Sequence, residues 1–161
     1  MRFERRVVHM IKCNDIRSAV DELERKALES PTMSPSHANY LAICKAKLGD
    51  LEAARDLLRV ALSESPRDPR IANNLGNVEL LLGDPDLALK MYRKACLRDP
   101  FSPEPRYNMC LAYLQLGQFE KALLAFKNYE TLCHLSANGK FIFFVAIAIL
   151  LVLFLYLRFA D

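Results

Sequence analysis

KLGDLEAARDLLRVALSESP, residues 47–66, is the first of three related stretches from which the architecture of the chain follows. The other two are LLGDPDLALKMYRKACLRDP at 81–100 and QLGQFEKALLAFKNYETL at 115–132. A Leu-Gly pair follows the first residue of each stretch, at positions 48–49, 82–83 and 116–117, so the pairs recur with one fixed period. A period of about 34 residues is typical of stacked units, because one unit alone cannot bury its apolar face. The sequence therefore predicts an array of repeats.

Small and large apolar residues alternate between fixed places in each unit. A small side chain lets two helices approach closely, and a large one fills the space between neighbouring pairs. The small residues are Ala42, Gly76 and Cys110 in the first segment and Ala54, Ala88 and Ala122 in the second, and their large partners are Leu58, Tyr92 and Phe126.

Turn signals divide each unit into two helices. Gly49, Gly83 and Gly117 end the first segment, where a left-handed backbone suits glycine best. Asp50 and Asp84 follow two of them and favour the N-terminus of a second helix, because a side-chain oxygen there accepts from a free backbone N–H. The pattern predicts helix–turn–helix units.

In this period and in these positions the sequence resembles the tetratricopeptide-repeat (TPR) family across residues 35–136. The resemblance implies an all-α solenoid of helical hairpins with a concave groove lined by the first helix of each pair. Residues 14–31 also align with 49–66 at an offset of 35, which predicts a degenerate fourth unit. Asn14 replaces the turn glycine there, and Asn also visits the left-handed region. Tyr129 and His134 depart from the pattern at the end of the third repeat.

The C-terminal segment FIFFVAIAILLVLFLYL, residues 141–157, carries no charge. As a helix it spans roughly 26 Å, and a snorkelling Arg158 extends the apolar length to residue 159. Apolar residues surround the whole helix, whereas a helix packed on the array would keep a polar face. We therefore expect one transmembrane helix. The expected boundaries are 1–34 for the degenerate unit, 35–68, 69–102 and 103–136 for the TPR repeats, 137–140 for a linker, 141–159 for the membrane helix and 160–161 for a short tail.

The order of these segments resembles that of a tail-anchored protein. The N-terminal stretch has no apolar core of signal-peptide length. The array is then expected to face the cytoplasm, with the C-terminal helix inserting after synthesis. Lys121, Lys127 and Lys140 precede the span and only Arg158 follows it, which agrees with a positive-inside arrangement.

Composition argues against several classes of function. A net charge of +3 gives no electrostatic footprint for nucleic acid. The five cysteines form no CxxC pair, so mostly buried free thiols are expected and no metal site. The five glycines form no phosphate-cradling loop, and the three histidines stand far apart. We expect no enzyme, no cofactor and no small-molecule substrate.

The resemblance implies which residues face the groove. Asn74 and Asn108, one period apart, occupy a position where some family members carry an asparagine ladder. An amide there can hold the backbone of a bound peptide or make a bond within the array, and both alternatives stay open. The predicted partner-binding residues are Asn39, Ile43 and Lys47 in the first repeat, Arg70, Asn73, Asn74, Asn77 and Leu81 in the second, and Tyr107, Asn108, Leu111 and Gln115 in the third.

The groove lacks the basic clamp with which some family members grip a carboxylate. Capture of an acidic chaperone tail is therefore not expected, and the lining favours a peptide or helix of modest charge. The sequence predicts a membrane-tethered protein-interaction adaptor. An assembly or secretion chaperone and a structural subunit of a membrane complex remain the alternatives. The clamp positions hold Asn39, Ile43, Asn74, Glu104 and Asn108.

Overall fold

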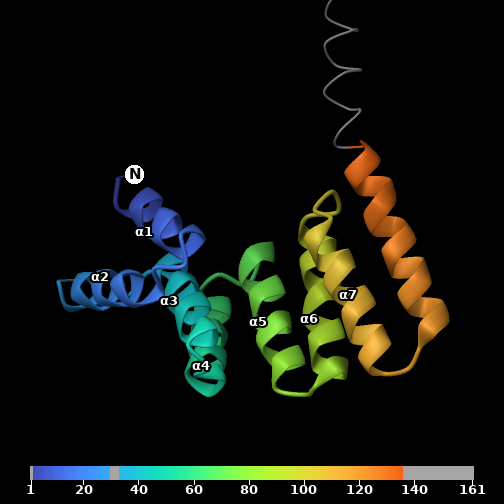
Figure 1. Ribbon diagram of the computed structural model, residues 1–161, viewed down its shortest axis with the longest axis horizontal. Helices are drawn as coiled ribbons and strands as arrows, with labels where there is room; N and C mark the ends of the chain where they lie inside the picture. Colours follow the sequence, from blue (N-terminus) through green and yellow to red (C-terminus); the bar gives the residue numbers. More distant parts are fainter. Residues whose placement is uncertain (1, 30–32, 136–161) are drawn as a thin grey trace, which may run out of the picture.

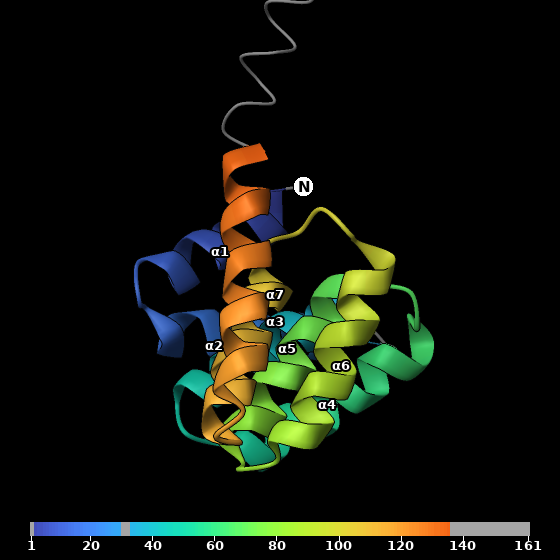
Figure 2. The same ribbon diagram turned by 90° about the vertical axis from the view of Figure 1, so that its right-hand side faces the viewer.

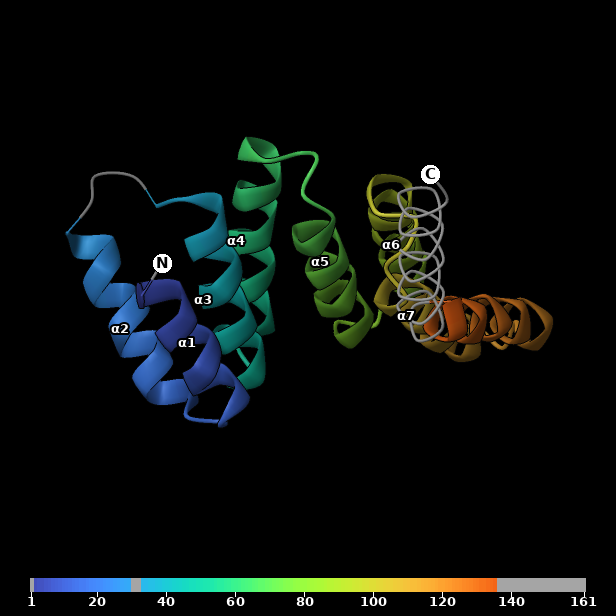
Figure 3. The ribbon, with the colours of Figure 1, turned by 90° about the horizontal axis from the view of Figure 1, so that it is seen from above.

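The computed structural model describes residues 2–29 and 33–135, and within these ranges every regular element is a helix. Each helix packs chiefly on the ones next to it in the chain, so that hairpins follow one another along the array (Figure 1). The same succession is seen from above in Figure 3. The helices are α1 (Arg2–Lys12), α2 (Ile16–Leu28), α3 (Pro35–Lys47), α4 (Leu51–Glu64), α5 (Pro69–Leu81), α6 (Pro85–Arg98) and α7 (Glu104–Gln115), followed by helical residues 119–135.

The capping residues expected from the sequence begin the second helices. The Asp50 carboxylate accepts from the Ala53 backbone N–H at 3.3 Å, and the Asp84 carboxylate accepts from that of Leu87 at 2.9 Å. Each bond satisfies one of the N–H groups that the first turn of a helix leaves unpaired. Pro85 occupies the first turn of α6, where its missing N–H costs nothing.

The turn within each hairpin has a left-handed residue. Gly49, Gly83 and Gly117 have φ values of 89°, 85° and 69°. Asn14 has a φ of 60°, the one positive value at a non-glycine residue among those described. The expectation that Asn replaces the turn glycine between α1 and α2 is therefore confirmed.

The core consists of small residues against large ones, repeated from hairpin to hairpin. Leu58 of α4 and Tyr92 of α6 are both 0% exposed. Leu58 belongs to a cluster that also holds Ala42 of its own hairpin and Leu75 of the next one, so this cluster joins two repeats. A separate cluster that includes Val7, Leu23 and Leu41 joins the first hairpin to α3.

Two polar contacts at equivalent positions also join neighbouring hairpins. The Arg59 guanidinium donates to the Glu79 carboxylate at 3.0 Å, linking α4 to α5. Arg93 and Tyr113 stand one period further on, and the Arg93 guanidinium donates to the Tyr113 hydroxyl at 3.0 Å. The Glu79 side chain is buried, so its pairing with Arg59 avoids an uncompensated charge.

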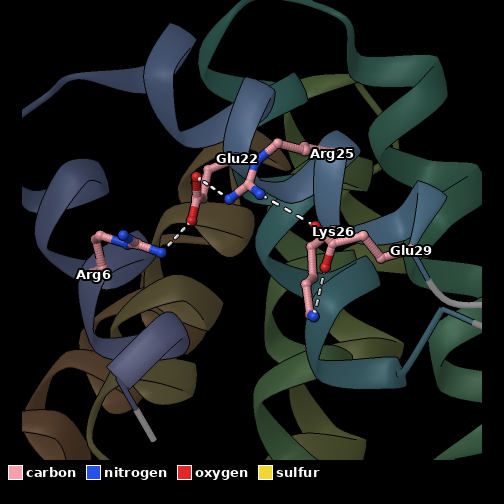
Figure 4. A network of polar contacts seen from close by, with 5 residues as sticks. All are labelled: Arg6, Glu22, Arg25, Lys26 and Glu29. Carbon is pink, nitrogen blue, oxygen red and sulfur yellow. Dashed lines mark hydrogen bonds and ion pairs between the residues drawn. The ribbon is translucent and has the colours of Figure 1, made fainter.

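An exposed ion-pair network joins α1 to α2 (Figure 4). Arg6 of α1 pairs with Glu22 of α2, which also accepts from Arg25 at 2.9 Å. The hydrogen bond from Arg25 holds the pKa of the Glu22 carboxyl below its ordinary value. Because the network lies in solvent, each pair contributes little, and the apolar cluster around Val7 carries most of this contact.

The free thiols are less buried than the sequence suggested. Cys44 and Cys110 are buried, and burial raises the pKa of Cys44 to about 11. Cys13 is exposed, because it follows the end of α1 at the turn toward α2, and there the expectation of a buried thiol was wrong.

None of the helices that the structure describes is long and apolar enough to cross a membrane. The predicted segments 137–140, 141–159 and 160–161 lie outside the described residues. The predicted unit boundaries likewise stay a prediction.

Gly76 of α5 tests how closely the paired helices approach. A Cβ at this position would lie 2.5 Å from Tyr92 Cε1, so we expect Gly76→Ala to destabilise the fold by about 1–3 kcal/mol. The first repeat has Ala42 with Leu58 at the same two places. Adding Tyr92→Leu should therefore cost less in the Gly76→Ala background than in the wild type. Urea unfolding of the four members of this cycle measures the coupling, and strictly additive effects would contradict the close contact.

Candidate protein-binding groove

The first helices of the hairpins form one continuous surface. Among α1, α3, α5 and α7, each helix contacts the next member of the set along the array. Side chains from different repeats therefore meet on this surface although they are about one period apart in the sequence. This is the groove that the family resemblance implied.

Two adjoining hollows lie in this groove, with volumes of about 330 and 360 Å³. Ile43 and Asn74 line both of them, so the two hollows share a wall. Eight of the twelve predicted groove residues line one or both hollows: Asn39, Ile43, Lys47, Arg70, Asn73, Asn74, Asn77 and Leu81. The other four, Tyr107, Asn108, Leu111 and Gln115, lie on α7.

The asparagines of the groove bond to one another across repeats. The Asn74 Nδ2 group donates to Asn39 Oδ1 at 2.8 Å, and the Asn108 Nδ2 group donates to Asn73 Oδ1 at 3.0 Å. The first bond joins α3 to α5 and the second joins α5 to α7. A bond within the array is therefore present. Each amide has four hydrogen-bonding sites, so contact with a peptide as well stays a prediction.

Two further groove residues are tied to the scaffold. Asn77 Oδ1 accepts from the Tyr92 hydroxyl at 2.9 Å, and burial raises the pKa of that hydroxyl. The Tyr107 ring of α7 lies 5.3 Å from the Tyr129 ring of the following helix. These contacts hold the groove side chains in place before any partner arrives.

The charges of the groove are mixed. Arg70 donates to the Asp68 carboxylate at 2.7 Å, and this bond holds the pKa of Asp68 below its ordinary value. Lys47 lies in the second hollow, whereas Asp99 and Glu104 line the first. The groove therefore carries both positive and negative side chains, and neither sign of charge predominates.

Apolar side chains face solvent beside these polar groups. Leu81 of α5, Tyr107 and Leu111 of α7 are all exposed. An exposed apolar residue next to a hollow can bury part of a partner's side chain, and the amides can pair with its backbone.

Sequence reasoning missed one groove residue on a first helix and the part of the groove outside the first helices. Tyr40 lines the first hollow and stands one period before Asn74, so the repeat itself could have identified it. Asp99 and Ser102 belong to the link between α6 and α7, and no positional rule for first helices covers that link. No group of three His, Cys, Asp or Glu side chains among the described residues could hold a metal ion.

Comparison with known families agrees with a solenoid of helical hairpins. A tetratricopeptide-repeat model matches residues 14–69 and 45–105, and a second model of the same description matches residues 103–123. These matches cover more than half of the 161 residues. The chain belongs to the tetratricopeptide-repeat family.

Solved structures of MamA have the same fold. The crystal structure of MamA superposes with a TM-score of 0.71 at 20% identity, covering 82% of this chain and 77% of that chain. MamA from Desulfovibrio magneticus RS-1, residues 41 to the end, gives a TM-score of 0.72 at 14% identity, covering 82% and 74%. At these identities the likeness establishes the fold alone. No curated protein matches the sequence.

Replacing Asn74 tests the bond between α3 and α5. We expect Asn74→Ala to destabilise the fold by about 1–3 kcal/mol, because it leaves the buried Asn39 amide without its partner. Gln115→Ala, at an exposed position of α7, should change stability by less than about 0.5 kcal/mol. Urea unfolding of the two variants makes the comparison, and equal stabilities would contradict the role of the bond.

Proposed function

We propose that this chain is a membrane-tethered adaptor that holds a peptide or a helix of a partner protein in the groove of α3, α5 and α7. The observation that carries the proposal is the gathering of eight predicted positions around two adjoining hollows. The family's arrays typically act as binding scaffolds rather than enzymes. The proposal accordingly assigns the chain no catalytic role.

The chemistry of the groove favours a partner of modest charge. Exposed Leu81 and Leu111 suit an apolar side chain of the partner, and Lys47 suits an acidic group beside it. Asp99 and Glu104 at the first hollow disfavour a strongly acidic segment there. An amphipathic helix or a short extended peptide fits these requirements.

The membrane part of the proposal rests on residues 141–157, which carry no charge. A helix of this length spans roughly 26 Å, at the short end of what crosses a hydrocarbon core. The array would then lie on the cytoplasmic side, with its groove beside the bilayer. In this arrangement a bound partner is concentrated at the membrane surface.

Charge introduced into the groove should abolish partner binding. Leu81→Asp combined with Leu111→Asp places two carboxylates where apolar contacts are expected, and the array should stay folded because both side chains are exposed. Val60→Asp on α4 changes an exposed apolar residue that lies outside the two hollows and is the matched control. Proximity labelling from the anchored protein, with quantitative mass spectrometry, should show neighbours lost only in the groove variant.

The pattern of loss also separates the alternatives. A neighbour that disappears from the labelled set but keeps its cellular abundance supports the adaptor, whereas a fall in its abundance points to a chaperone. Labelling that is identical in the groove variant and in Val60→Asp would contradict the groove assignment. Neighbours lost only when 141–157 is replaced by an unrelated apolar helix would indicate a structural subunit.

A charge in the middle of the C-terminal segment should weaken the anchor. Each Arg at the centre of a membrane helix costs about 2.5–3.5 kcal/mol, so Ile149→Arg with Val152→Arg should release the protein from membranes. Leu97→Arg, on an exposed apolar residue of α6, is the control, and this variant should stay in the membrane fraction. Alkaline extraction of membranes followed by sedimentation makes the comparison. Release of the unaltered chain would contradict the anchor.

A further inference from the structure

The helix of residues 119–135 closes the described array and presents an apolar face outward. In the end-on view it lies in front of the other helices (Figure 2). Phe119, Leu123 and Phe126 are spaced by four and three residues, which places them on one side of the helix. Leu123 is 70% exposed and Phe126 is 37% exposed.

The positions of Phe126 and Leu123 are covered inside the array. Leu58 and Tyr92 precede Phe126 by two periods and one, and both are fully buried. Leu89 precedes Leu123 by one period and is 4% exposed. The first helix of the following hairpin buries them: Leu58 packs with residues of α5, and Tyr92 packs with residues of α7. The exposed face therefore has the shape and chemistry to receive one more first helix.

The chain itself has an apolar segment close enough in sequence to the closing helix to pack against this face. Residues 29–34 join α2 to α3, residues 65–68 join α4 to α5 and residues 99–103 join α6 to α7, so links between hairpins have four to six residues. Five residues, 136–140, lie between the last described residue of the closing helix and the segment 141–157. Phe143 and Ala146 stand one period after Met109 and Ala112, which pack on the preceding hairpin.

We propose that residues 141–157, before they enter a membrane, fold back onto the face of Phe119, Leu123 and Phe126 in the place of a further first helix. Burial of apolar area drives this docking, at roughly 25 cal/mol per Å² removed from water. The array covers only one side of the segment, whereas a bilayer surrounds it completely. Lipid therefore displaces the docked state, and the array shelters its own anchor until a membrane is reached.

The inference rests on the proposed function in that the same segment is the anchor. It adds a second binding surface, distinct from the groove of α3, α5 and α7, whose ligand is part of the chain. Insertion of the segment leaves Phe119, Leu123 and Phe126 uncovered.

Leu123 and its neighbour Leu124 provide a matched pair for the test. Leu124 is 61% exposed, but its equivalents one and two periods earlier are Lys90 and Asp56, both exposed. A photo-reactive phenylalanine analogue is placed at 123 or at 124 in the full chain, which is synthesised in a cell-free system without membranes. Position 123 should cross-link to residues 141–157 several-fold more than position 124, and added phosphatidylcholine liposomes should remove the difference.

If residues 141–157 continued in the direction of the closing helix, they could not cross-link to position 123. Residue 123 lies twelve residues before residue 135, or roughly 18 Å along the helix axis. Peptide mapping of the cross-linked chain identifies the residues joined. Equal yields from 123 and 124 would overturn the proposal, and so would products that join two copies, which indicate a dimer.

Flotation of the same samples with the liposomes separates this inference from the proposed function. A chain that floats with lipid, yet gives no preference for 123 in its absence, retains the anchor and overturns the docking. A chain that does not float, yet cross-links from 123 in all samples, overturns the anchor and the displacement by lipid.

Discussion

The close approach of two helices at a small side chain is the contact from which the array is built. Ala54, Ala88 and Ala122 are all buried, in clusters that also hold side chains from the first helix of their own hairpin. At Gly76 the two helices approach more closely still, since even a methyl group there would collide with Tyr92. Because the second helix comes so close, its large residue reaches past its partner into the next hairpin. The stacking of repeats follows from the packing within each one.

Stacking in turn builds the groove. Once hairpins repeat at a fixed spacing, their first helices become neighbours, and amides from adjacent repeats come within hydrogen-bond distance. Asn39 with Asn74 and Asn73 with Asn108 are the result. The side chains that face a partner are therefore partly ordered by the scaffold, so a partner loses less free energy in ordering them.

Most of the fold could be predicted from the repeat period in the sequence. The period led to the left-handed residue Asn14 and to eight groove positions around the hollows. It could not give the offset between neighbouring helices. For that reason the asparagines pair at a separation of 35 in the sequence, one more than the period, and a ladder of strictly equivalent positions does not describe them. The period also equated Phe126 with Leu58 and Tyr92, but Phe126 stays partly exposed because no described helix follows it. The pairing of the asparagines and the exposure of Phe126 both depend on which helices lie next to each other in the fold, which the period does not specify.

The concave side of α3, α5 and α7 is the surface proposed to hold a partner protein beside a membrane. Cross-linking mass spectrometry of the full chain in its cells of origin locates a bound partner on the array. Partner cross-links should concentrate on the groove side, around Lys47 and Tyr107. Cross-links that fall instead on the outer helices α4 and α6, around Glu52 and Lys90, would contradict the groove as the binding surface.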